Sequence, residues 1–144
     1  MPVSRSSRLR RAYQRANNSG DIISPDLLNS QDDNDYVLVS FQYLQKGYDL
    51  DDKSLTKDHR ANLLSKLVLI TQSTWTTLLM TSKRSGFEMM ERAKTELRPR
   101  GVTDDVKKLI VARFSSQKCR LIGFRRDNVF FILYIDAKLT AYKH

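Results

Sequence analysis

The stretch RLIGFRRDNVFFILYIDAKLTAYKH, residues 120–144, decides the fold. Two runs rich in Leu, Ile, Phe and Val flank Asp127 and Asn128, and both of these residue types can adopt the left-handed backbone conformation of a tight hairpin turn. We therefore expect antiparallel strands over residues 118–126 and 129–137. Arginines lie at the start and at the turn of this apolar hairpin, which raises the question of what they bind.

The segments before this hairpin predict further strands and helices. Alternating apolar residues over 36–44 and the run LIVARFSS, residues 109–116, predict two more strands. Apolar residues at helical spacing predict a helix over 56–71 that continues through 75–80, and a second helical stretch over 87–97. Helices grouped between strands indicate an α+β fold with a small, mainly antiparallel sheet. The expected order is strand, helix, helix, strand, strand, strand, with the helices packed on one face.

The N-terminal segment differs in composition from the rest of the chain. Residues 1–34 begin basic, end acidic and lack a sustained apolar face. We therefore expect a flexible or loosely docked segment there, followed by a single domain over residues 35–144. The early arginines fit a nucleic-acid-binding arm, a solvated tail or a transit peptide. No apolar run approaches the length of a membrane span, so we expect a cytoplasmic protein with no membrane partner.

Positive charge is concentrated in the last third of the chain. The net charge is +9, and residues 98–144 contain eleven Lys and Arg against four Asp and Glu. A basic surface confined to one part of a small protein is expected for an anionic partner, usually nucleic acid or an acidic protein segment. A basic face that only confers solubility would have the same composition.

Several enzyme classes lack their sequence signatures here. The chain has no glycine-rich phosphate loop, no Gly-x-Ser-x-Gly elbow, no HExxH motif and no Cys-x-x-Cys pair, which argues against nucleotide-driven and zinc-dependent enzymes and predicts no cofactor. The lone Cys119 excludes an intrachain disulfide and fits a small core residue. The acidic pairs Asp51–Asp52 and Asp104–Asp105 are expected to cap helices, so no metal site is predicted.

The two-residue turn also sets a register for the hairpin. Arg126 would lie opposite Val129, and Arg120 would lie opposite Ile135 at the far end. The alternation of side chains places Arg120 on the same face as Ile122, which is apolar.

An arginine on an apolar face needs a partner, because an unpaired guanidinium is very costly to bury. Arg120 must therefore reach a sheet margin, a carboxylate or a cleft. Two interpretations stay open. Arg120 forms a salt bridge with Asp136, Glu88 or Glu91, or it grips a phosphate in a cleft with two parallel hydrogen bonds.

The end of the chain supplies groups for acid–base chemistry. His59 and His144 are the residues that titrate near neutral pH, and His59 is expected on a helix surface. Continuing the last strand would place Tyr142 and His144 on one side, next to Lys143, so that an ordered end presents acid, base and cation together. Such a cluster suits RNA cleavage by attack of the 2′-hydroxyl on its own phosphate, which needs neither metal nor cofactor.

On these residues the chain resembles the RelE/YoeB-type toxins of bacterial toxin and antitoxin pairs. The resemblance covers the element order over residues 36–144. It is sharpest in CRLIGFRRDNVFFILYIDAKLTAYKH, where a basic strand is followed by a turn, an apolar strand and a short end with Tyr and His. The resemblance implies an endoribonuclease that cleaves mRNA, commonly in the ribosomal A site, and that an antitoxin protein silences.

The resemblance also implies roles for individual residues. Arg120 would bind and stabilise the phosphate, His144 would act as general acid or base, and Tyr142 would stack on a base or assist proton transfer. The RNA backbone would be bound by basic residues of the hairpin and of the chain end: Lys118, Arg125, Arg126 and Lys143.

Two other functions stay compatible with the sequence. A non-catalytic nucleic-acid- or ribosome-binding module needs only the charge, and its affinity would fall steeply as salt rises. A phage or mobile-element protein that acts through protein–protein interaction would use Trp75, Met89 and Met90 as anchors, although these side chains also fit a hydrophobic core.

Overall fold

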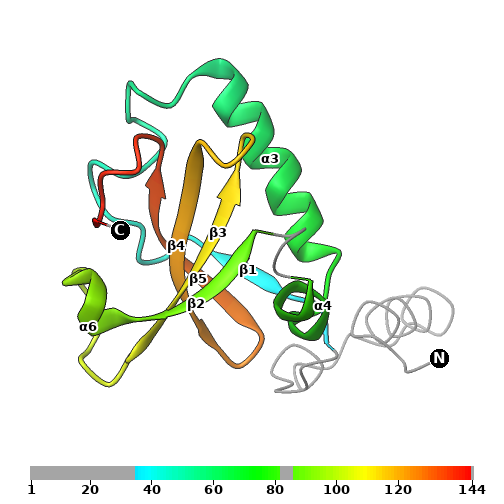
Figure 1. The fold of residues 1–144 in the computed structure, drawn as a ribbon, viewed down its shortest axis with the longest axis vertical. Helices are drawn as coiled ribbons and strands as arrows, with labels where there is room; N and C mark the ends of the chain where they lie inside the picture. The colour runs from blue at the N-terminus through cyan, green and yellow to red at the C-terminus, as the bar shows by residue number, and fades with distance from the viewer. Residues whose placement is uncertain (1–34, 82–85, 144) are drawn as a thin grey trace, which may run out of the picture.

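The computed structural model describes residues 35–81 and 86–143, so the predicted N-terminal segment and His144 lie outside the described residues. The strands are β1 (Leu38–Ser40), β2 (Phe87–Glu91), β3 (Lys108–Phe114), β4 (Cys119–Arg126) and β5 (Val129–Asp136). The helices are α3 (Lys57–Thr71), α4 (Trp75–Met80) and α6 (Arg92–Thr95). One sheet has the order β1-β5-β4-β3-β2, with β1 parallel to β5 and the other neighbours antiparallel (Figure 1). The predicted α+β class with a small, mainly antiparallel sheet is confirmed.

The hairpin β4–β5 turns where the sequence predicts, and its register changes halfway along. Asp127 has a φ of 56°, the left-handed conformation expected in the turn. Arg126 pairs with Val129 as predicted, but a β-bulge between Ile122 and Gly123 shifts the register beyond it. The prediction that Arg120 lies opposite Ile135 is therefore wrong, because the bulge inserts one residue into β5.

Gly123 and Leu133 explain the bulge. A Cβ at Gly123 would lie 2.1 Å from the carbonyl oxygen of Phe131, so the strands approach too closely there for any other residue. Leu133 is the inserted residue, and its carbonyl accepts a hydrogen bond from the Gln45 amide at 2.8 Å. As a result Arg120 lies directly opposite Asp136.

The second predicted helix, 87–97, is wrong over its first half. Residues Phe87–Glu91 form β2, which pairs with β3 at the edge of the sheet, and a single helical turn, α6, follows. Phe87 points into the core while Met90 packs on the opposite face, which is the alternation of a strand. The predicted strand over 36–44 is also shorter, because the chain turns after β1 with a Leu44 to Phe41 backbone hydrogen bond.

Helices α3 and α4 cover one face of the sheet (Figure 1). Thr56 caps α3 in a capping box with His59, and Thr74 caps α4 through the amide of Thr77. Trp75 of α4 is fully buried and packs edge-on against Phe130 of β5, with ring centroids 5.9 Å apart. The predicted packing of helices on one face is confirmed for α3 and α4, whereas the single turn α6 lies beside β2 on the other side of the sheet (Figure 1). In the described part of the chain, no helix combines the length and the apolar character needed to cross a membrane.

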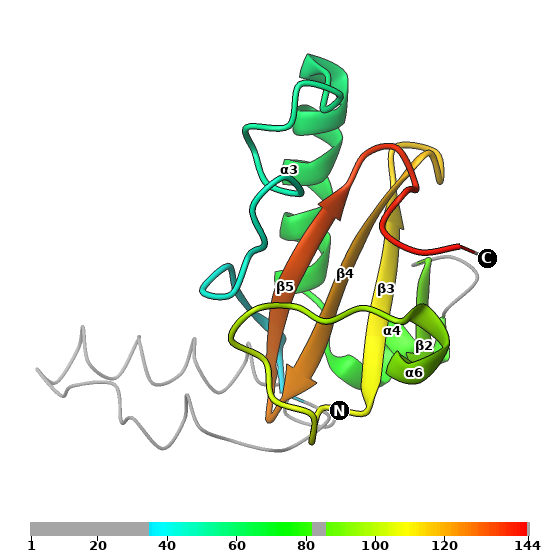
Figure 2. The ribbon, with the colours of Figure 1, turned by 90° about the vertical axis from the view of Figure 1, so that its left-hand side faces the viewer.

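The opposite face of the sheet is covered by loops and by the C-terminal segment, residues 137–143. Tyr43, Tyr48 and Val102 from the loops pack against this face, together with Tyr142. Figure 2 shows the C-terminal segment turning back after β5 and passing in front of β4 and β3. Leu139 has a φ of 59°, which allows this reversal. The chain end is therefore brought over the middle of the sheet.

Candidate functional site

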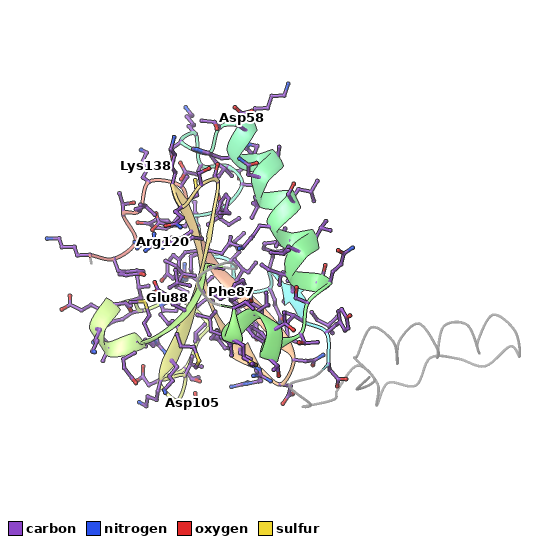
Figure 3. All side chains as sticks on the ribbon, turned by 45° about the vertical axis from the view of Figure 1, so that its right-hand side comes forward. Asp58, Phe87, Glu88, Asp105, Arg120 and Lys138 are labelled. Carbon is purple, nitrogen blue, oxygen red and sulfur yellow. The ribbon has the colours of Figure 1, made fainter. Side chains whose placement is uncertain are left out.

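Four charged side chains form a row across the face that Tyr142 covers. Arg120 of β4 pairs with Arg113 of β3 on one side and with Asp136 of β5 on the other. Glu88 of β2 completes the row, since its Oε1 lies 3.9 Å from Nη2 of Arg113. Glu88 and Arg120 lie on the same side of the sheet (Figure 3). Two arginines directly opposite each other repel, and the acids at both ends of the charged row offset this.

Arg120 is buried and bound within the protein. Its side chain is 0 % exposed, and its Nε donates to Oδ2 of Asp136 at 2.8 Å. Its Nη2 donates to the carbonyl oxygen of Tyr142 at 2.9 Å, and its Cζ lies 3.7 Å from the centroid of the Tyr142 ring. Of the two interpretations left open by the sequence, the salt bridge with Asp136 is the one found. The guanidinium does not line an open cleft.

Asp136 connects the sheet to the C-terminal segment. Its Oδ1 accepts from the Thr140 amide and its Oδ2 from the Ala141 amide, each at 3.0 Å. Together with Arg120, the carboxylate therefore accepts three hydrogen bonds while fully buried. This satisfies the carboxylate without water and fixes the backbone immediately before Tyr142.

Tyr142 lies in the field of the whole charged row. Burial raises the pKa of its phenol above the ordinary value of 10.0, and the charges of Glu88 and Asp136 raise it further while Arg120 and Arg113 oppose them. The phenol therefore stays protonated at neutral pH. Tyr142 is 5 % exposed and its hydroxyl oxygen is buried, so the phenol is not open to an anion from solvent.

Arg113 and Glu88 form the accessible end of the charged row. The Arg113 side chain is 20 % exposed and the Glu88 side chain 52 % exposed. A carboxylate and a guanidinium thus meet at the edge of this face, where they can serve as base and cation, while the Tyr142 hydroxyl lies buried behind them. We refer to Glu88, Arg113, Tyr142 and the adjacent exposed Lys143 as the candidate site.

Arg113 and Glu88 were not among the site residues predicted from the sequence. Glu88 was considered only as a partner for Arg120, because residues 87–97 were expected to be helical. A signal for Arg113 was present: it lies as far before the turn at residues 115–118 as Arg120 lies after it, so the two arginines face each other across β3 and β4.

The remaining predicted RNA-binding residues lie in separate places. Lys118 is exposed in the turn between β3 and β4, while Arg125 and Arg126 lie at the other end of β4. Arg125 packs over the ring of Trp75, with its Cζ 4.9 Å from the ring centroid. The length of β4 separates these two arginines from Arg120 by roughly 20 Å, so they are not part of the candidate site.

The three residues that the sequence suggests as protein-binding anchors also differ in their exposure. Trp75 is a core residue, Met90 is partly buried against the loop-covered face, and Met89 is half exposed on the edge strand β2. Among residues 35–81 and 86–143, no group of three His, Cys, Asp or Glu side chains is arranged to hold a metal ion. Neither a protein-family model, nor a curated protein, nor a solved structure matches the chain.

Proposed function

We propose that this protein is a metal-independent endoribonuclease that cleaves mRNA, as in the toxin family that its C-terminal hairpin resembles. The observation that supports this proposal is the accessible pair of Glu88 and Arg113 at the end of the charged row, next to the C-terminal segment. Cleavage of RNA by its own 2′-hydroxyl needs a base, a cation and an acid close together, and needs no group from outside the protein.

Each group has a role that follows from its chemistry. The Glu88 carboxylate takes the proton of the 2′-hydroxyl, whose oxygen then forms a bond to the adjacent phosphorus. Arg113 stabilises the negative charge that develops on the phosphate oxygens. The chain end, through Lys143 or His144, donates a proton to the 5′ oxygen as the bond from phosphorus to that oxygen breaks, because the Tyr142 hydroxyl is buried. The products are a 2′,3′-cyclic phosphate and a 5′-hydroxyl end.

The basic residues predicted from the sequence keep a place in this proposal. Lys143 is exposed next to Tyr142, where it can bind a neighbouring phosphate, and Lys118 is exposed at the end of the sheet nearest to Arg120. Arg125 and Arg126 would bind a more distant part of the RNA strand. His144 follows Lys143 and remains a candidate acid or base. Arg120 is given no direct contact with RNA, because it is fully buried.

The proposal includes an antitoxin protein and a cytoplasmic location, where mRNA is translated. An antitoxin that silences the enzyme has to cover the candidate site or exclude RNA from it. Helix α3, on the face opposite the candidate site, exposes Leu64, Val68 and Leu69, so a partner that binds there must also extend around the sheet to exclude RNA. Co-expression with the product of a neighbouring small gene, followed by co-purification and loss of RNA cleavage, would test this part.

The experiment that tests the catalytic proposal incubates the purified protein with free mRNA in the presence of a chelator and, separately, with translating ribosomes in magnesium buffer. Cleaved ends are mapped, and their chemistry is determined. We expect 2′,3′-cyclic phosphate ends with the unaltered protein, and a loss of about 100-fold or more with Glu88→Gln or Arg113→Ala. Glu91→Gln is the matched control, because Glu91 is an exposed glutamate of the same strand on the opposite face.

Two results would overturn the proposal. If Glu88→Gln and Arg113→Ala both cleave at the unaltered rate, the candidate site is not catalytic. If RNA stays intact on and off the ribosome while the protein binds it with a steep dependence on salt, the protein is a binding module instead.

A further inference from the structure

We propose that Arg120 and Asp136 form a clamp that holds the C-terminal segment over the sheet and so positions Tyr142 and Lys143 in the candidate site. Neither clamp residue touches RNA. The inference rests on the proposed function for its catalytic consequence, while the docking of the C-terminal segment can be measured without RNA.

The hydrogen bonds of the clamp follow the C-terminal backbone residue by residue. Asp136 accepts from the amides of Thr140 and Ala141, each at 3.0 Å. Arg120 donates to the carbonyl oxygen of the next residue, Tyr142, at 2.9 Å. Three consecutive residues are thus held by two side chains that are themselves joined at 2.8 Å. As long as both side chains are present, these bonds hold the backbone of residues 140–142 in one position over β4.

Arg120 also fixes the orientation of the Tyr142 ring. The guanidinium carbon lies 3.7 Å from the ring centroid, which is the geometry of a cation–π contact, and the site is desolvated. Because the guanidinium packs against one face of the Tyr142 ring, the ring keeps one orientation, and so does its hydroxyl group. The phenol therefore depends on Arg120 for its place beside Arg113 and Glu88.

A phosphate ligand would need properties that Arg120 lacks. Its side chain is 0 % exposed, and its donors face Asp136 and the Tyr142 carbonyl. An RNA phosphate would have to remove the C-terminal segment before reaching it. Arg113, its neighbour on β3, is 20 % exposed and lies at the accessible end of the charged row. We therefore assign phosphate binding to Arg113 and positioning to Arg120.

The clamp also explains how two arginines can be paired directly opposite each other on neighbouring strands. Arg113 and Arg120 are directly opposite each other, and like charges in such a pair repel. Asp136 neutralises Arg120 inside the protein, so that Arg113 pairs with Glu88 at the accessible end of the charged row. The clamp thereby shapes the charge of the candidate site as well as its geometry.

The test uses variants that keep the chain folded. The double variant Arg120→Met with Asp136→Leu replaces a buried ion pair by apolar groups of similar size, an exchange that proteins commonly tolerate. Arg120→Lys keeps the charge but cannot serve Asp136, the Tyr142 carbonyl and the ring together. Amide hydrogen exchange at Thr140 and Ala141 reports docking, circular dichroism reports folding, and single-turnover and steady-state cleavage report kcat and KM.

For both variants we expect a folded protein, faster exchange at the two amides and a kcat reduced by about 100-fold, with KM changed less than about threefold. Arg113→Lys is the contrasting variant, because it should slow cleavage while the amides stay protected. If Arg120 binds phosphate itself, Arg120→Lys will raise KM and leave amide exchange unchanged, which would overturn the clamp.

The two proposals fail in different ways. Amides that exchange faster in the double variant, without any RNA cleavage by the unaltered protein, would refute the endoribonuclease and leave the clamp as a device that docks the chain end. Amides that stay protected in the folded double variant would refute the clamp, whatever happens to RNA.

Discussion

The two ends of the β4–β5 hairpin carry the same kind of residue in opposite environments. At one end Arg120 is fully buried, 2.8 Å from Asp136. At the turn Arg126 is 61 % exposed and lies 3.7 Å from the exposed Asp105. The difference in exposure comes from the surroundings of each arginine. The bulge places Arg120 opposite Asp136 and the C-terminal segment covers it, whereas Arg126 is surrounded by solvent. Both arginines belong to β4, so it is the neighbouring residues, and not the strand, that decide whether an arginine in this hairpin is buried or accessible.

The largest expected effect comes from removing one member of the buried pair. Arg120→Ala leaves the Asp136 carboxylate buried without its cation and should lower the free energy of unfolding by about 3–5 kcal/mol. Urea denaturation of the variant and of the unaltered protein measures this difference. The double replacement Arg120→Met with Asp136→Leu is the control, and it should recover most of the loss. A loss below about 1 kcal/mol in Arg120→Ala would mean that the pair is not buried in solution.

The bulge that brings Arg120 opposite Asp136 gives the next effect. In Gly123→Ala the new methyl group would collide with the carbonyl oxygen of Phe131, so the strands must separate, at a cost of about 1–3 kcal/mol. Thermal unfolding would detect it. Gly47→Ala is a useful comparison, because the position has a φ of 88° but no atom within 4 Å of the added Cβ. Equal stability of Gly123→Ala and the unaltered protein would contradict the close approach of β4 and β5 at the bulge.

The third effect is confined to alkaline pH. Burial raises the pKa of Tyr142 in the folded protein above that of the unfolded chain, so the unfolded chain loses this proton first as pH rises. The contribution of Tyr142 to stability is therefore complete below pH 10.0 and is lost as pH rises through the folded pKa. Denaturant melts from about pH 8 to about pH 11 should show a steeper decline for the unaltered protein than for Tyr142→Phe. Parallel declines would show that the phenol is not buried.

The smallest effect is expected at the turn. Arg126→Ala removes an exposed ion pair and should change the free energy of unfolding by less than about 0.5 kcal/mol. The same substitution should weaken RNA binding, if the proposed function is right, by a similar factor for different RNA sequences, because a contact to the backbone carries no base specificity. A stability loss approaching that of Arg120→Ala would remove the contrast between the two ends.

The hairpin and the long helix could be predicted because the residues that specify each of them lie close together in the sequence. The turn at Asp127–Asn128 and the apolar runs beside it define two strands, and leucines at helical spacing with a cap at Thr56 define α3. The strand β2 could not be predicted in the same way. FEMME, residues 87–91, is too short for its period to separate a helix from an edge strand, and pairing with β3 decides the outcome.

The candidate site was predictable only in part, for the same reason. Asp136 was among the partners considered for Arg120, and Tyr142 was expected near it. The bulge depends on a contact between Gly123 and the backbone of β5, which no local pattern encodes. Glu88 contacts Arg113 only because β2 is a strand. The incorrect prediction of a helix over residues 87–97 therefore prevented the prediction of the accessible half of the charged row.

The most direct test of the proposed catalytic site is the ratio of single-turnover cleavage rates of Glu88→Gln and Glu91→Gln on one mRNA substrate, measured on ribosomes in magnesium buffer and on free mRNA with a chelator. The two variants remove one exposed glutamate each from opposite faces of β2. We predict that Glu91→Gln cleaves at the unaltered rate and that Glu88→Gln is slower by about 100-fold or more. Equal rates for the two variants would contradict the assignment of Glu88 and Arg113 as the catalytic pair.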